Sequence, residues 1–253
     1  ASKALAEHWD MAVMSKTLAT IEVHADFPYE LSEAKLGNIF TEEAYAFFQK
    51  LQFKNLLSKF DVTAPANQVE DGFEQITDYK KAEKVLDQAK ESACVGAVIF
   101  QNTENVLPLF TNEAAIGGIG LCFDEEHAYC IEVTEQITKE FLLAKLSKLN
   151  ESCGRFVMFD IKEAMKWLPI KNQKHCFDAT VAAYLLNPLK NDYTYEDVAR
   201  EQLNIVIEEK SEAYVKVCYE AYTAFKGSDL LYKKLEETQM LHLFEDIEMP
   251  LVF

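Results

Sequence analysis

Residues 155–168 read RFVMFDIKEAMKWL, and residues 176–188 read CFDATVAAYLLNP. These two stretches decide the predicted fold. The first opens with a run of large apolar residues that is typical of a buried strand, and it continues into an amphipathic helical pattern. In the second, Asp178 is a good N-cap acceptor, and Asn187-Pro188 ends the helix that follows. A strand, a helix and a second capped helix in succession predict an α/β core.

The segments around these stretches predict further strands and helices, which together indicate a mixed sheet with helices packed on it. Strands are predicted at residues 73–77, 93–100, 115–123 and 127–133, the last two joined as a hairpin at Asp124-Glu125-Glu126. Helices are predicted from the cap Asp78 to Ala89, over about residues 135–149, after the cap Thr194, and as two C-terminal helices that separate near Gly227-Ser228.

Residues 1–61 have a different, all-helical pattern. A helix is predicted over residues 1–23, and a strongly aromatic helical stretch follows Thr41 and continues to Phe60, where the aromatic residues indicate core packing. The segment DVTAPANQVEDG at residues 61–72 is polar and rich in helix breakers, so it predicts a domain boundary. The candidate core contacts of the first helix are Trp9, Ala12, Val13, Leu18 and Ile21.

Composition narrows the possible functions. The chain has 42 acidic and 25 basic residues and a formal net charge of −17. Because proteins bind nucleic acids by neutralising phosphates with Lys and Arg, we expect weak or no DNA binding by this chain alone. It lacks an apolar run long enough for a membrane span and a signal-peptide pattern, so we expect a cytoplasmic protein without membrane association. Its six cysteines are scattered, which favours reduced, buried thiols over disulfides or a zinc site.

Three separated pieces point to one family. SKTLATI at residues 15–21, with TEEAYAFFQKLQFKNLLSKF at 41–60, resembles the end of a 5′ nuclease domain. FDIKEAMKWL, FDATVAAYLLNP and TYEDVAREQL, within residues 159–203, resemble segments of a 3′–5′ exonuclease domain. FEDIEMPLVF at residues 244–253 is similar to the entry into a polymerase domain. In this order and spacing, these pieces resemble bacterial DNA polymerase I (family A) over essentially the whole chain.

The resemblance implies a domain organisation. Residues 1–61 would be the helical C-terminal part of a 5′ nuclease region, residues 62–244 an exonuclease-like domain with a ribonuclease-H-like fold, and residues 245–253 the start of a polymerase domain. The chain is therefore expected to be an excised fragment. Its parent would be a DNA polymerase that extends a 3′ hydroxyl in replication and repair, with Mg²⁺ as the cofactor of the polymerase site, which this fragment lacks.

The resemblance also implies a chemistry. Active relatives remove mispaired 3′ nucleotides with two metal ions about 4 Å apart, which carboxylates from three motifs hold. In this sequence the first motif falls on Gln101 and Thr103, and the ligand aspartate of the second falls on Ala164. For the third motif the nearest acid is Glu220, with Lys216 in the position of the family's tyrosine. The resemblance therefore predicts that the metal-binding set is degenerate.

Other acids are weak substitutes for the missing ligands. Asp160 stands where the family has asparagine, and we interpret it as the cap of the following helix. We expect Glu104 and Glu163 to be solvated. Asp178, although part of the family pattern, is more simply the cap of its own helix. No catalytic, metal-binding or cofactor-binding residue is therefore assigned to this fragment.

Two functions from different classes follow from the resemblance. The favoured one is a non-catalytic domain that links the 5′ nuclease to the polymerase and packs against the polymerase domain in cis, in a monomeric protein that reaches DNA through its full-length parent. The alternative is an active two-metal proofreading exonuclease with relocated carboxylates. A third interpretation, an unrelated acidic protein-interaction domain, predicts a fold without the mixed sheet.

Overall fold

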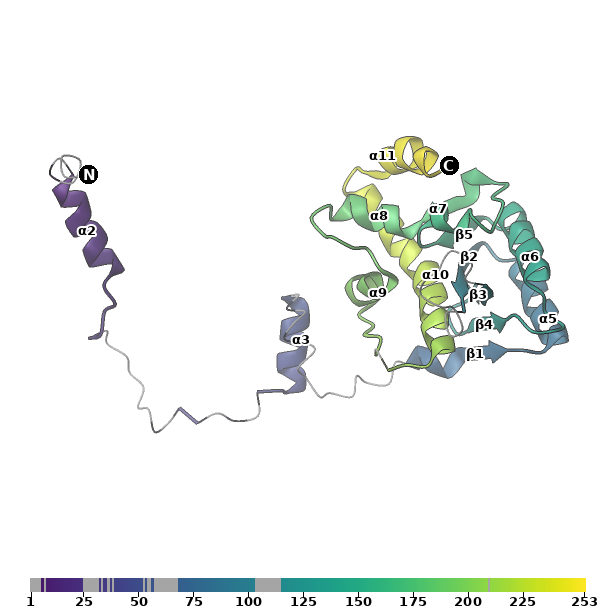
Figure 1. The fold of residues 1–253 in the computed structure, drawn as a ribbon, viewed down its shortest axis with the longest axis horizontal. Coiled ribbons are helices and arrows are strands. Elements are labelled where there is room, and N and C mark those ends of the chain that lie inside the picture. The colour runs from purple at the N-terminus through teal and green to yellow at the C-terminus, as the bar shows by residue number, and fades with distance from the viewer. Residues whose placement is uncertain are drawn as a thin grey trace. The chain divides into compact units, whose positions relative to one another are not determined.

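The computed structural model describes residues 6, 8–24, 32, 34–35, 37, 39–51, 53, 56, 68–102, 115–208 and 210–253. The chain forms two compact units, Ala1–Val62 and Thr63–Phe253. Figure 1 shows the elements of both units.

The described part of the first unit contains two helices, α2 (Trp9–Ala19) and α3 (Glu42–Lys50). The prediction that α2 packs its apolar side chains into a core is wrong for this unit: α2 has no buried residue, and Leu18 is 80% exposed. The physical reason is that its apolar residues are spread around the helix, so no single side could be buried. In α3 the predicted core residue Phe47 is 59% exposed, and this helix ends at Lys50. Leu56 is helical again, and the end of the predicted stretch at residues 57–60 lies outside the described residues.

The described residues of the second unit form a sheet of six strands in the order β1-β4-β3-β2-β5-β6. The pairs β1–β4, β2–β5 and β5–β6 are parallel, and β3 is antiparallel to both of its neighbours. The predicted mixed sheet and the β3–β4 hairpin are therefore confirmed. The strands are β1 (Phe73–Ile76), β2 (Cys94–Gln101), β3 (Ile116–Cys122), β4 (Ala128–Glu132), β5 (Arg155–Met158) and β6 (Cys176–Asp178).

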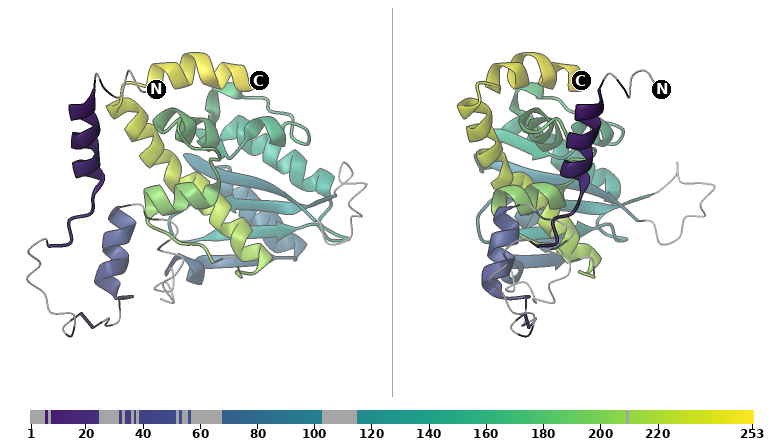
Figure 2. Two further views of the ribbon diagram at one scale, coloured as in Figure 1. Left: turned by 60° about the vertical axis from the view of Figure 1, so that its left-hand side comes forward. Right: turned by 90° about the vertical axis from the view of Figure 1, so that its left-hand side faces the viewer.

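Helices cover both faces of this sheet. The long helix α10 lies across one face, and α5 and α6 cover the other (Figure 1 and Figure 2). Apolar clusters are buried on both faces, one around α10 and a larger one that includes the inner sides of α5 and α6. The helices and turns are η1 (Gln68–Gly72), α5 (Tyr79–Ala89), α6 (Lys139–Ser152), α7 (Ile161–Ala164), η3 (Gln173–His175), α8 (Ala179–Leu186), α9 (Tyr195–Leu203), α10 (Ala213–Glu237), α11 (Leu241–Leu243), the π-helical η4 (Phe244–Glu248) and α12 (Met249–Val252).

Two strand glycines allow α10 to approach the sheet closely. A Cβ atom on Gly96 would lie 2.3 Å from the carbonyl oxygen of Ala221 and 2.5 Å from the backbone nitrogen of Phe225, both in α10. A Cβ atom on Gly120 in β3 would lie 2.7 Å from Cγ1 of Val217. Glycine in a strand often marks such a close backbone approach. The helix that crosses the sheet is therefore positioned by the absence of side chains beneath it.

Side-chain caps fix where several helices begin. Asp78 accepts a hydrogen bond from the backbone N–H of Lys81 at 2.9 Å, and Thr194 accepts one from that of Asp197 at 3.3 Å, so both predicted caps are confirmed. The helix predicted from about residue 135 begins later, because Thr138 is its cap and accepts from the N–H of Phe141 at 3.2 Å. Local acceptors thus set these boundaries.

The predicted break near Gly227-Ser228 is wrong, because α10 continues through these residues to Glu237. Both residues are buried. A Cβ atom on Gly227 would lie 3.3 Å from Cγ1 of Val198, so glycine provides room for the crossing of α9. The hydroxyl of Ser228 donates to the carbonyl of Phe225 at 2.8 Å. Tertiary packing here outweighs the low helix propensity of glycine.

The six cysteines are free thiols, as predicted; five are buried, and Cys94 is partly buried. Burial raises the pKa of the Cys153 and Cys176 thiols to about 12, so neither thiolate is populated at neutral pH. Of the helices in the described part of the chain, none has the length and apolar character needed to cross a bilayer.

Candidate functional site

The first motif position lies at the carboxyl end of β2. Because β2 and β5 are parallel neighbours, the segments that follow them leave the sheet at the same edge. Gln101 is the last residue of β2, follows a register shift after Phe100 and is exposed. Its amide is neutral, so it supplies no anionic oxygen to a cation. Thr103 and Glu104 lie outside the described residues.

The second motif position lies in α7, just beyond β5. Ala164 is the last residue of this short helix, and its side chain belongs to the apolar cluster, with 8% of the residue exposed. An alanine methyl group cannot bind a metal ion. Glu163, beside it, is exposed and forms an ion pair with Lys166, in agreement with the expectation that it is solvated.

Asp160 links β5 to α7. Its backbone is left-handed, with φ 49° and ψ 67°, a region that Asp and Asn tolerate better than most residues. Its Oδ1 accepts a hydrogen bond from the N–H of Glu163 at 3.1 Å, and its own N–H donates to Oγ1 of Thr180 at 3.2 Å. The interpretation of Asp160 as a helix cap is confirmed.

Asp178 is buried at the end of β6, and backbone groups use both of its carboxylate oxygens. Oδ1 accepts from the N–H groups of Thr180 at 2.9 Å and Val181 at 3.2 Å, and Oδ2 accepts from that of Ile161 at 2.8 Å. Burial raises the pKa of Asp178, and the three N–H donors oppose that rise. One carboxylate thus caps α8 and fixes the start of α7, which confirms the predicted role as a cap.

Glu220, the acid nearest the third motif, lies on α10 and is partly buried. Burial, and to a smaller extent the charge of Glu196 in α9, raise its pKa to about 7. Burial and the neighbouring carboxylate of Glu196 also raise the pKa of Tyr195. Lys216, one turn earlier on α10, is partly buried. The proximity of Glu196 to Glu220 could not be predicted, because Glu196 has the local pattern of an acid in the first turn of a helix.

Comparison with known sequences identifies similar proteins. DNA polymerase I of Bacillus subtilis (strain 168) is 27% identical over 98% of this chain, and that of Geobacillus stearothermophilus is 29% identical over 73% of it. The chain resembles bacterial DNA polymerase I. It spans 29% and 20% of the lengths of these two relatives. No family model matches the chain.

Solved structures with the same fold include a polymerase I and two exonuclease-type proteins. The polymerase domain of Pol1 from M. smegmatis, in complex with primer-template DNA and dNTP, has a TM-score of 0.54 at 16% identity and covers 71% of this chain and 30% of its own. The catalytic core of RRP6 from Trypanosoma brucei (TM-score 0.55, 12% identity) and NrnC from Brucella melitensis bound to pGG (TM-score 0.52, 13% identity) each cover 71% of this chain, and 52% and 88% of their own chains. The second unit therefore has the ribonuclease-H-like fold of 3′–5′ exonucleases, as predicted.

The side chains at the polymerase I motif positions do not fit a pair of Mg²⁺ ions, which require several carboxylate oxygens. Gln101 is neutral, Ala164 has no donor, and the oxygens of Asp178 are bound to backbone N–H groups. Over the described residues, no group of three or more His, Cys, Asp or Glu side chains could hold a metal ion. Among the described residues, the segments that follow β2 and β5 leave the sheet at one edge, and their side chains do not form a cation site there.

The raised pKa of Glu220 predicts a pH-dependent stability. In the unfolded chain the pKa returns to its ordinary value of 4.5, so the folded state binds more protons between pH 4.5 and about 7, and stability falls as the pH rises through this window. Glu220→Gln removes the charge, so the variant should match the wild type near pH 4.5 and be more stable at pH 8. The expected gain is up to about 3 kcal/mol.

Urea unfolding of both proteins at the two pH values measures this difference. Glu236→Gln is a matched control, because Glu236 is exposed on the same helix and should show the wild-type pH dependence. Equal stabilities of the Glu220→Gln variant and the wild type at pH 8 would show that Glu220 titrates normally.

Proposed function

We propose that this chain is part of a DNA polymerase I that acts in replication and repair. In this proposal residues 62–244 form an exonuclease-like domain that has lost its two-metal site and supports the polymerase domain by packing against it. Residues 1–61 correspond to the end of a 5′ nuclease region, and residues 245–253 to the start of the polymerase domain. The similarity to polymerase I of Bacillus subtilis over 98% of the chain supports this assignment.

The observation that supports the proposal is that packing and capping groups occupy positions where the resemblance implies metal ligands. Ala164 belongs to the apolar core at a position where the resemblance implies an aspartate. Asp178, the buried acid nearest to it in the fold, is occupied by three backbone donors. These residues stabilise α7 and α8, which supports a structural role for the domain.

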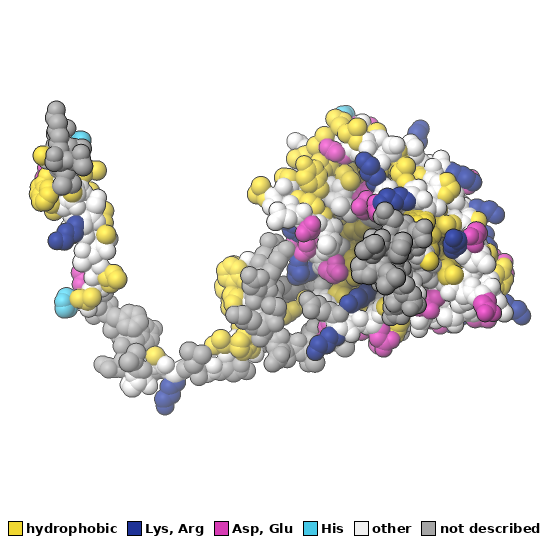
Figure 3. Space-filling view, in the orientation of Figure 1, with side chains coloured by type: hydrophobic (Ala, Val, Ile, Leu, Met, Phe, Trp, Pro, Cys, Tyr) yellow, Lys and Arg dark blue, Asp and Glu magenta, His cyan; other side chains and the backbone are white. Residues whose placement is uncertain are grey.

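Charge supports weak DNA binding by this chain alone. Its net charge is −17, and on the face of the second unit seen in Figure 3 the Lys and Arg side chains are interspersed with Asp and Glu. Phosphate binding depends on clustered basic residues that displace counterions. The DNA-binding surface of the parent protein is accordingly proposed to lie outside this chain.

A nuclease assay tests the proposal. The 253-residue chain, mixed with a 3′-labelled single-stranded oligonucleotide and Mg²⁺ or Mn²⁺, should release no nucleotide above the rate without protein. The physical reason is that the described donors cannot hold the two ions that activate water and stabilise the leaving oxygen. Metal-dependent release that Asp160→Asn or Glu220→Gln abolishes would contradict the proposal.

One observation favours the alternative, an active exonuclease with relocated carboxylates. Glu196 in α9 lies close enough to Glu220 in α10 to raise the pKa of Glu220. Paired carboxylates can share a proton or a cation. The same assay separates the two functions, because relocated ligands would make release depend on both Glu196 and Glu220.

A further inference from the structure

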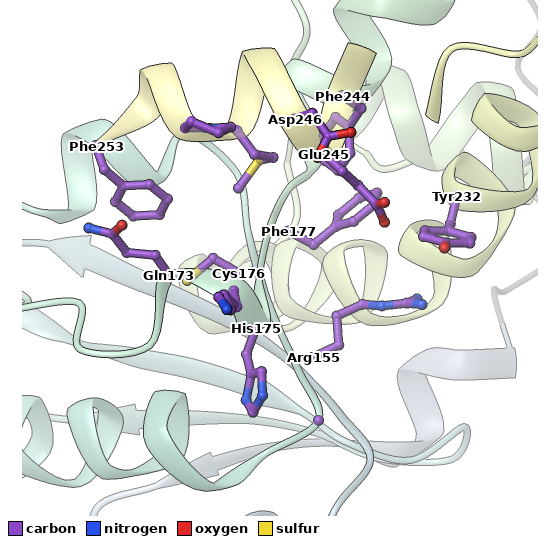
Figure 4. Close-up of a pocket in the computed structure, with 14 residues that line it drawn as sticks. Arg155, Gln173, His175, Cys176, Phe177, Tyr232, Phe244, Glu245, Asp246 and Phe253 are labelled. Atoms are coloured by element: carbon purple, nitrogen blue, oxygen red, sulfur yellow. The ribbon is translucent and has the colours of Figure 1, made fainter. Parts of the chain in front are cut away.

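A pocket of about 680 Å³ lies at the opposite end of β5 from the motif positions. Its walls come from the start of β5, from the turn η3 with β6, and from the helical segment that ends at Phe253. Figure 4 shows the side chains that line it. Its volume lies in the range of small-molecule sites, which is roughly 300–1,000 Å³. The π-helical η4 forms part of one wall, and π-helical turns are frequent at functional sites.

In one half of this pocket the basic side chain, Arg155, already has partners in the protein. The guanidinium of Arg155 donates to Asp229 Oδ1 at 2.7 Å and lies over the rings of Tyr232 and Phe177, 4.9 and 5.8 Å from their centroids. Burial and the nearby carboxylate of Glu245 raise the pKa of the Tyr232 hydroxyl. The guanidinium of Arg155 therefore already has an ion-pair partner and two aromatic rings against it.

The acid Asp246, which also lines the pocket, has a partner as well. Its Oδ2 lies 3.3 Å from Nε2 of His242, one turn earlier along the helical segment. Asp246 thus has a partner in the protein, and Glu245 lies near Tyr232.

The other half of the pocket carries polar groups without partners. The side chains of Gln173 and Lys174 in η3 form no hydrogen bond or ion pair with any described residue. Nδ1 of His175 is buried and has no hydrogen-bond partner among the same residues. Met249 and Phe253 supply apolar lining to the pocket. In Figure 4 the Gln173 amide lies beside the ring of Phe253.

We propose that this half of the pocket binds a nucleoside monophosphate. Lys174 supplies a positive charge for the phosphate. The ring of Phe253, which is partly buried and lines the pocket, offers a stacking surface for the base, because every base has a π-face. The Gln173 amide beside that ring has a donor and an acceptor that match the edge of a base such as adenine. A charged group, a flat apolar surface and an amide together match the parts of a nucleotide.

The site does not depend on whether the exonuclease-like edge of the sheet is active. It is built from the amino ends of β5 and β6, whereas the motif positions follow the carboxyl ends of β2 and β5. An active or an inactive exonuclease edge would leave it unchanged.

Calorimetric titration of the 253-residue chain with adenosine 5′-monophosphate tests the proposal. We expect saturable binding of one molecule, with a Kd below about 1 mM. Adenosine and ribose 5-phosphate, which lack the phosphate or the base, should each bind at least about tenfold more weakly. Lys174→Ala and Phe253→Ala should each raise Kd about tenfold. Lys174 is exposed and Phe253 is partly buried, and circular dichroism checks that both variants keep the fold of the wild type.

Lys84→Ala is the matched control, since Lys84 is an exposed lysine on α5 and should leave Kd unchanged. A 5′-phosphorylated oligonucleotide distinguishes the two possible ligands. If it binds more tightly than the free nucleotide, the ligand is the end of a nucleic-acid strand; if it binds more weakly, the ligand is the free nucleotide. Absence of saturable binding up to about 5 mM nucleotide, or a Kd that neither Lys174→Ala nor Phe253→Ala changes, would overturn the proposal.

Discussion

Replacing Gly96 with alanine is expected to lower the free energy of unfolding of the second unit by about 3 kcal/mol. The added methyl group would lie 2.3 Å from the carbonyl oxygen of Ala221 and 2.5 Å from the backbone nitrogen of Phe225. Both atoms belong to the backbone of α10, so no side-chain rotation relieves the overlap. The helix would have to move away from the sheet along its length, which opens gaps elsewhere in a close-packed interior.

Gly227→Ala is the control for this experiment, because it adds the same methyl group to α10 itself. That methyl group would meet only Cγ1 of Val198, at 3.3 Å, and alanine has the higher helix propensity. Denaturant unfolding should place this variant within about 1 kcal/mol of the wild type. If both variants lost the same stability, the close approach of α10 to Gly96 would not be what positions the helix.

Asp178→Ala is expected to cost about 3 kcal/mol of stability. The substitution leaves the buried N–H groups of Ile161, Thr180 and Val181 without their acceptor. An unpaired buried donor costs more than the mean value of a hydrogen bond, because it loses its solvation without compensation. The loss should be the same with and without a metal chelator, since the role of the carboxylate is structural.

Asp78→Ala provides the comparison, because Asp78 caps α5 through a hydrogen bond to one N–H group at an exposed position. Its loss should be about 1 kcal/mol, as for an ordinary N-cap. Thermal or urea unfolding measures both variants. Equal losses at the two positions would show that the additional bond from Asp178 to Ile161 contributes little.

Local signals in the sequence predicted local features well. The caps Asp78, Asp178 and Thr194 were predictable because a short acceptor side chain before an apolar helical pattern has few other roles. The strand patterns likewise indicated the mixed sheet, since apolar runs bounded by turn residues depend on neighbours in the sequence. These features and the motif resemblance were sufficient for the fold of the second unit.

Features that depend on distant residues were not predictable. Gly227 suggests a helix break when taken alone, yet its packing against Val198 keeps α10 continuous. The pairing of Glu196 with Glu220 depends on how α9 and α10 cross, which neither segment encodes by itself. For the candidate site, the sequence therefore indicated which residues stand at the motif positions that the resemblance implies, but not what the nearby acids contact.

Calorimetric titration of the 253-residue chain with Mn²⁺ is the direct test of the proposal that this domain has no two-metal site. With Gln101, Ala164 and the capped Asp178 at the site, we predict no saturable binding with a Kd below about 1 mM. Binding of two Mn²⁺ ions with micromolar affinity would contradict the prediction. If the Glu220→Gln variant did not bind them, the result would support an exonuclease centre with relocated carboxylates.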